Sequence, residues 1–119
     1  MLKRQFRLKN NSAFSATYRL KNSYYKSGIA LFVGKQKEDL TQPTKVGFVV
    51  SKKTHKRAVK RNRLKRLMRE SYRLLLKDRK VGISQNAISL IFVGHEKALG
   101  KNFNEINSII THLLGEIKW

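Results

Sequence analysis

Residues 56–77 constrain the fold of this chain more than any other segment, because their apolar and cationic residues repeat with the period of an α-helix. At about 100° per residue, one side of this predicted helix is an apolar stripe of Leu64, Leu67, Met68, Ser71, Tyr72 and Leu75. The opposite side carries Asn62, Arg66, Arg69 and Arg73, flanked by Arg63 and Lys65. The apolar stripe must be buried against a second layer, which predicts a layered fold with a basic helix face in solvent.

Three short apolar runs predict the sheet against which this helix packs. They are rich in β-branched and aromatic residues and span residues 28–34, 45–51 and 87–93. Residues 35–44 form a polar connection that contains the only proline, so the first two strands are expected to be an antiparallel pair. We therefore expect an α/β (α+β) two-layer sandwich, with a small mixed sheet packed on a long basic helix.

Two further helices are predicted near the ends of the chain. Residues 11–20 fit a short helix that is capped by one of its first two residues. Residues 102–118 repeat apolar residues with helical spacing, and Asn102 and Glu105 stand in the positions of a capping box. This last helix carries little charge and is expected to be scaffold.

The positive charge is concentrated inside the sequence. The chain has 119 residues, of which 27 are Lys or Arg and 7 are Asp or Glu, for a formal net charge of +20. Residues 51–80 hold 14 basic and 2 acidic groups, whereas residues 81–119 hold 3 of each, which does not fit a basic tail. A hydrophobic content of 40% and this length fit a single folded domain, residues 1–119, with a polyanionic partner.

The basic helix carries two electrostatic penalties that a bound anion would remove. Like charges stand four residues apart in the pairs Arg57/Arg61, Arg61/Lys65, Lys65/Arg69 and Arg69/Arg73, at roughly 0.2–0.5 kcal/mol each. Lys52, Lys53, Lys56 and Arg57 crowd the expected helix N-terminus, where the helix dipole already presents positive partial charge. A bound phosphate makes this arrangement favourable, which indicates a nucleic-acid surface. The alternative is an ordinary solvated face.

Residues 46–73 read VGFVVSKKTHKRAVKRNRLKRLMRESYR, a strand ending in Ser-Lys-Lys that leads into a helix with the pattern Ala-Val-x-Arg-Asn-Arg-x-Lys-Arg-x-x-Arg. This gapless run resembles the signature of the protein subunit of bacterial ribonuclease P. The resemblance extends more loosely to the N-terminal RLKNNSAFSATYR stretch, where Ala13 replaces a common acidic residue and Tyr18 stands where Phe is usual. It covers most of the chain.

The resemblance implies a ribonucleoprotein and a fold with an unusual left-handed βαβ crossover. In that family a large RNA subunit, with its bound Mg²⁺, removes the 5′ leader of precursor tRNA, while the protein binds the RNA and the leader. The residues that would face RNA are Lys52, Lys53, Arg57, Arg61, Asn62, Arg63, Lys65, Arg66 and Arg69. The amide of Asn62 can both donate and accept hydrogen bonds. Between two arginines, this residue would help to hold the RNA in a defined register, which charge alone does not do.

The resemblance also implies that Phe14, Tyr18 and Phe32 line a cleft in which the leader runs. Stacking of a base on an aromatic ring contributes roughly 1–3 kcal/mol and tolerates any base, which suits a leader of variable sequence. The alternative is that Phe14 and Tyr18, four residues apart on one helix face, are simply part of the core.

No catalytic residue and no metal site is expected in the protein itself. The seven acidic residues are scattered, the three histidines lack metal-ligand spacing, and the chain has no cysteine. The chemistry is therefore expected in the RNA partner, with Mg²⁺ held mainly by RNA and substrate. Two other classes stay open: a ribosomal or chromatin protein, and a self-sufficient nuclease.

The chain is expected to be cytoplasmic, free of membrane partners and monomeric on its own. No apolar run approaches the roughly 18 residues of a membrane span, and the first ten residues are charged where a signal peptide would be apolar. An organelle transit peptide is the alternative, because no acidic residue precedes Glu38.

Overall fold

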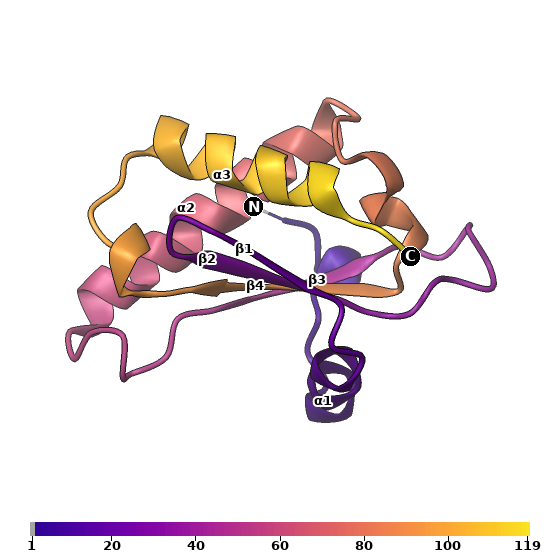
Figure 1. Cartoon of the computed structure of the whole chain (residues 1–119), viewed down its shortest axis with the longest axis horizontal. Coiled ribbons are helices and arrows are strands. Elements are labelled where there is room, and N and C mark those ends of the chain that lie inside the picture. The colour runs from indigo at the N-terminus through magenta and orange to yellow at the C-terminus, as the bar shows by residue number, and fades with distance from the viewer. Residues whose placement is uncertain (1) are drawn as a thin grey trace.

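The computed structural model describes residues 2–119, which form a four-stranded sheet with three α-helices (Figure 1). The helices are α1 (Asn11–Arg19), α2 (Ala58–Lys77) and α3 (Phe103–Glu116). The strands are β1 (Ser23–Lys26), β2 (Ile29–Val33), β3 (Lys45–Val49) and β4 (Ser89–Gly94). Short 3-10 turns lie at Arg4–Phe6, Gly82–Asn86 and Glu96–Ala98. The predicted α+β class is confirmed.

The helices are divided between the two faces of the sheet. Figure 1 shows α2 and α3 together on one face and α1 alone on the other. Thr17 of α1 is 2% exposed, and its hydroxyl bonds to the hydroxyl of Ser89 on β4. This short helix therefore covers only part of its face of the sheet.

The strand order is β1-β2-β4-β3, so one prediction from the sequence is wrong. The strands β2 and β3 are not paired, because β4 lies between them, antiparallel to β2 and parallel to β3. The polar connection from Val33 to Lys45 joins two strands that β4 separates, so it does not make a hairpin. Together β3, α2 and β4 form a βαβ crossover, whose left-handed sense stays a prediction.

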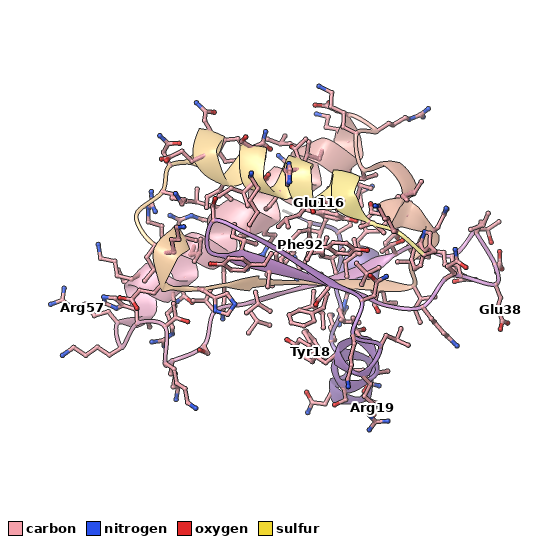
Figure 2. The ribbon with its side chains drawn as sticks, in the orientation of Figure 1. Tyr18, Arg19, Glu38, Arg57, Phe92 and Glu116 are labelled. Carbon is pink, nitrogen blue, oxygen red and sulfur yellow. The ribbon has the colours of Figure 1, made fainter. Side chains whose placement is uncertain are left out.

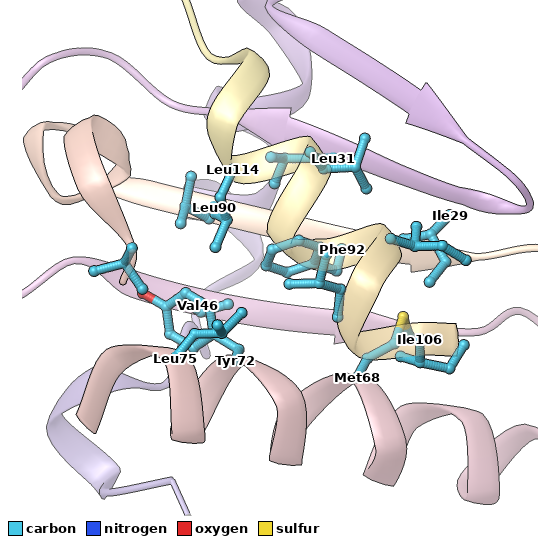
Figure 3. Close-up of a cluster of buried hydrophobic side chains, with 14 of the residues drawn as sticks. Ile29, Leu31, Val46, Met68, Tyr72, Leu75, Leu90, Phe92, Ile106 and Leu114 are labelled. Atoms are coloured by element: carbon cyan, nitrogen blue, oxygen red, sulfur yellow. The ribbon is translucent and has the colours of Figure 1, made fainter. Parts of the chain in front are cut away.

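The core lies between the sheet and the α2–α3 layer. Figure 3 shows Phe92 of β4 among side chains that include Met68, Tyr72 and Ile106. The predicted stripe on α2 is buried at Leu64, Met68, Ser71, Tyr72 and Leu75, but Leu67 is only partly buried and packs at the margin of the core. The stripe is thus one residue narrower than the helical period suggests.

The helix ends agree with their predicted caps at one end of the chain only. Asn102 accepts a hydrogen bond from the N–H of Glu105, whose carboxylate accepts one from the N–H of Asn102, so the capping box is confirmed. The cap of α1 is Asn10, one residue before the predicted positions, and its side chain accepts from the N–H of Ser12. The long helix starts at Ala58, and Arg57 gives it no side-chain cap.

Tyr72 makes the stability of this fold sensitive to high pH. Its side chain is buried, its hydroxyl accepts a hydrogen bond of 2.9 Å from Gln85 Nε2, and burial raises its pKa to about 12. An unfolded tyrosine has a pKa of about 10, so this contribution is complete below pH 10 and is lost as pH rises toward 12. We expect the free energy of unfolding of Tyr72→Phe to lack this loss. Between pH 10 and pH 12 the wild type should therefore lose about 2–3 kcal/mol more than the variant. Urea unfolding of both proteins across this range measures it, and parallel curves contradict it.

Candidate nucleic-acid interface

The outward side of α2 presents an exposed basic surface. Asn62 and Arg66 are exposed on the helix, and Lys52, Lys53 and Arg57 are exposed on the loop before it (Figure 2 labels Arg57). Lys65 and Arg69 are half-buried beside them. The ion pairs found among residues 2–119 are Arg73–Glu70, Lys101–Glu105 and His112–Glu116. None of the nine residues predicted to face RNA takes part in one of these pairs.

Two arginines of the predicted set also hold the local structure. Arg61 Nη1 donates to the carbonyl oxygens of His55, at 2.7 Å, and Lys56, at 3.0 Å. Arg63 Nη1 donates to the carbonyl oxygen of Lys101, at 3.2 Å, which ties α2 to the segment before α3. These bonds leave each guanidinium with further N–H donors. The two arginines therefore hold the local structure and also present positive charge, and sequence reasoning did not foresee the structural role.

His55 also holds the loop before α2, a role that sequence reasoning missed. Its Nδ1 accepts a hydrogen bond of 3.0 Å from the N–H of Arg57, and its carbonyl accepts from Arg61. These contacts fix the loop that carries Lys52 and Lys53 into the N-terminus of α2. A lone histidine in a basic run gives no sequence signal for such a role.

The basic row on α2 ends at Arg69. The next residue of the row, Arg73, forms a charged pair with Glu70 on the same helix. The hydrogen bond from Arg73 lowers the pKa of Glu70, and the same bond raises the pKa of Arg73. Arg73 is thus neutralised inside the protein, whereas Arg66 and Arg69 keep their net positive charge for a partner.

The three predicted cleft aromatics lie on the face of the sheet that α1 partly covers. Strand register places Gly47, Ile91 and Phe32 in one row across β3, β4 and β2, and α1 lies over this row. The rings of Tyr18 and Phe32 meet edge to face with centroids 4.8 Å apart, and Tyr18 is 37% exposed. The half-exposed aromatic edge can accept a base while its inner part stays packed.

The cleft and the basic helix adjoin each other. Phe14 of α1 and Arg69 of α2 line one hollow of about 260 Å³, together with Arg7 and Phe48. The aromatic surface is therefore reached from the cationic row without crossing the core. Such a pairing of rings with cations is typical of surfaces that bind single-stranded nucleic acid.

Comparisons with known proteins place the chain in one family. The family model described as Ribonuclease P matches residues 2–118. The ribonuclease P protein component of Clostridium kluyveri is 34% identical over 109 residues, covering 92% of this chain and 91% of the relative. That of Clostridium novyi is 35% identical over 113 residues, covering 95% and 94%. The chain belongs to the bacterial ribonuclease P protein family.

Solved ribonuclease P proteins share the fold. The protein from Staphylococcus aureus matches with a TM-score of 0.73 and 24% identity, over 92% of this chain and 93% of that one. The protein from Thermotoga maritima matches with a TM-score of 0.75 and 21% identity, over 95% and 98%. With the family, the predicted function class is confirmed: the chain is the protein subunit of a ribonucleoprotein endoribonuclease that acts in tRNA 5′ processing.

Two further observations on the described residues concern metal ligands and membrane-spanning helices. Within residues 2–119 no group of three or more His, Asp or Glu side chains gathers as a ligand set. In the same part of the chain, no helix is both long and apolar enough to cross a membrane.

Gly47 offers a test of how Phe14 is positioned. A Cβ at Gly47 would lie 2.5 Å from Cζ of Phe14, so Gly47→Ala must push the ring outward. The ring is half-buried on the cleft side, so its displacement should cost little stability. We expect weaker binding of leader-bearing precursor tRNA with a melting temperature close to wild type. Both are measured on the reconstituted enzyme and the free protein; unchanged leader binding would contradict the assigned position of Phe14.

Proposed function

We propose that this chain, as one RNA-binding domain over residues 1–119, binds the catalytic RNA of ribonuclease P through α2 and the 5′ leader of precursor tRNA through the aromatic cleft. By holding both RNAs it assists endonucleolytic removal of the leader. The observation that carries the proposal is the presence of two different, adjoining surfaces on one small fold: cations of α2 that stay outside the ion pairs of residues 2–119, and half-exposed rings on α1 and β2.

On α2, guanidinium groups pair with phosphates in a bidentate manner and Asn62 adds a group that both donates and accepts. The proposed contact residues are Lys52, Lys53, Arg57, Arg61, Asn62, Arg63, Lys65, Arg66 and Arg69. Arg61 and Arg63 act twice, because the hydrogen bonds that fix the loop and α3 also set the position of their charges.

In the cleft, Phe14, Tyr18 and Phe32 stack on leader bases without reading their sequence. The cleavage chemistry belongs to the RNA partner, and Mg²⁺ is held mainly by that RNA and the substrate. The protein lowers the Mg²⁺ demand of assembly because its cations screen phosphates where two RNAs meet. We place the free protein in the cytoplasm as a monomer with no membrane partner.

The proposal is tested by cleavage of precursor tRNA with a bacterial ribonuclease P RNA at low Mg²⁺, with and without this protein. We expect the wild-type protein to stimulate cleavage, and Asn62→Ala and Arg66→Ala to weaken assembly by about 1.5–3 kcal/mol each, as for a hydrogen bond to a charged group. Arg61→Ala should do the same and also loosen the loop at His55.

The matched control for these variants is Lys80→Ala, which removes an exposed charge beyond the end of α2. Exposed helix positions tolerate alanine, so all the helix variants should keep the wild-type melting temperature, except Arg61→Ala. Wild-type assembly in Asn62→Ala and Arg66→Ala, or equal weakening in Lys80→Ala, would mean that α2 is not the RNA-subunit surface.

A further inference from the structure

The short helix α1 is a ridge with two different flanks. Thr17 points at the sheet, and at about 100° per residue Phe14 and Tyr18 fall on one side of it, on the leader cleft. Ala13, Ala16 and Leu20 fall on the other side, where the leader cleft does not reach. The second flank faces the connection between β2 and β3.

Three hollows that share lining residues follow one another along this second flank, and together they are called the groove. Its middle is a hollow of about 460 Å³ with an apolar floor that includes Ala16, Leu20 and Ile88. One end is a hollow of about 750 Å³ that shares Leu8, Ala13 and Lys45 with the middle. The other end, of about 470 Å³, shares Leu20, Gly34 and Lys35 with it.

The rim of the groove is cationic at both ends. Arg4, Arg7, Lys9 and Lys45 surround one end, and Lys21, Lys35 and Lys118 surround the other. No Asp or Glu is among the described residues that line the three hollows. The pKa of Lys9 is lowered by loss of solvent around its ammonium group and then by the charges of Arg4, Arg7 and Lys45. These positive charges lie close together, and a bound phosphate chain would remove the free-energy cost of their repulsion.

Trp119, the only tryptophan of the chain, stands at the far end of the groove and is 47% exposed. The residue before it is fixed by hydrogen bonds: the carbonyl oxygen of Lys118 accepts from Asn22 Nδ2 and from the hydroxyl of Tyr24, both at 3.2 Å, and its N–H donates to the Tyr24 hydroxyl at 2.8 Å. An aromatic ring is thus presented beside Lys21 and Lys35 by an anchored backbone.

We propose that this groove binds an unpaired segment of the RNA subunit, with phosphates along the cationic rim, bases over the apolar floor and one base stacked on Trp119. Arg7 lines both the groove and the hollow that Arg69 of α2 shares with Phe14, so the groove adjoins the α2 surface. The leader is already assigned to the opposite flank of α1, which leaves the RNA subunit as the occupant of the groove, and the inference rests on that part of the proposed function. A duplex would hide its bases and gain nothing from the apolar floor or from Trp119.

Trp119 is its own reporter. We expect a saturable change in its emission when a single-stranded RNA dodecamer is added to the free protein, and none with a duplex of the same length at equal phosphate concentration. The change should persist in Phe14→Ala with Tyr18→Ala, which removes the leader cleft. In the complex, the RNA subunit should change the emission, and precursor tRNA added afterwards should not.

Matched variants test the contribution to affinity. Lys21→Gln with Lys35→Gln should lower the logarithmic salt slope for the dodecamer by about 1.4, because each phosphate contact on a single strand contributes about 0.7. Lys77→Gln with Lys80→Gln removes the same charge outside the groove and should leave the slope unchanged. Trp119→Ala should weaken RNA-subunit binding at least about fivefold.

Three results overturn the groove assignment while leaving the proposed function intact: a stimulated cleavage reaction with constant Trp119 emission, an equal response to duplex, or equal slopes for the two lysine pairs. An emission change that comes only with precursor tRNA assigns the groove to substrate and also overturns it. Failure to form any complex with the RNA subunit overturns the proposed function itself.

Discussion

Association of this chain with the RNA subunit is expected to weaken by a factor of about 10³–10⁵ between roughly 50 and 200 mM monovalent salt, the range for six to ten phosphate contacts. Nine proposed contact residues lie on α2 and its preceding loop, and none of them forms an ion pair within the described chain. The Lys and Arg side chains can therefore displace counterions from the RNA phosphates without first breaking protein salt bridges, and this counterion release gives a linear logarithmic salt dependence.

Two neighbouring variants separate charge from hydrogen bonding in this measurement. Arg66→Ala should reduce the slope by about 0.7–0.9, the value for one phosphate, whereas Asn62→Ala should weaken binding at every salt concentration with no change of slope. Binding constants from filter retention at four or more salt concentrations suffice. A flat profile, or equal slopes for the wild type and Arg66→Ala, would refute the electrostatic account.

The helices of this fold could be predicted from the sequence because their signals are local. The burial of Leu64, Met68 and Tyr72 follows the helical period, and the capping box at Asn102 involves groups three residues apart. The basic face of α2 follows from the same period. The charge pattern already predicts a nucleic-acid surface, and the resemblance to a family narrows the expected partner to the RNA of ribonuclease P. The family match confirms the resemblance, whereas the contact residues stay a prediction.

The strand pairing could not be predicted, because it depends on contacts far apart in the chain. The apolar runs of β2, β3 and β4 are similar, and nothing local shows that β4 enters between the other two. The strand β1 was missed because Ser23–Lys26 is only four residues long and places two tyrosines side by side, so its sequence shows no apolar-polar alternation. The structural bonds of Arg61 and Arg63 likewise join residues whose proximity only the fold creates.

Loss of the cleft rings is expected to weaken binding of the substrate and to leave assembly with the RNA subunit unchanged. Phe14→Ala with Tyr18→Ala should weaken holoenzyme binding of precursor tRNA with a leader of several nucleotides by roughly 1–3 kcal/mol per lost stack. Tyr18 is 37% exposed and covers the edge of Phe32, and Phe14 rests on Gly47, so both rings offer a surface to a ligand while closing the sheet behind them. Affinity for the RNA subunit should stay near wild type, because α1 contributes little of the charge on which assembly depends.

The matched control replaces the rings with aliphatic side chains. Phe14→Leu with Tyr18→Leu keeps apolar bulk over the sheet but removes the flat π-face, so a stacking role predicts nearly the same loss as the alanine pair, with a melting temperature closer to wild type. Mature tRNA, which has no leader, should bind all of these proteins almost equally. If the leucine pair restores precursor binding, the rings act by packing alone. If mature and precursor tRNA weaken together, the aromatics make general contacts and the leader follows another path.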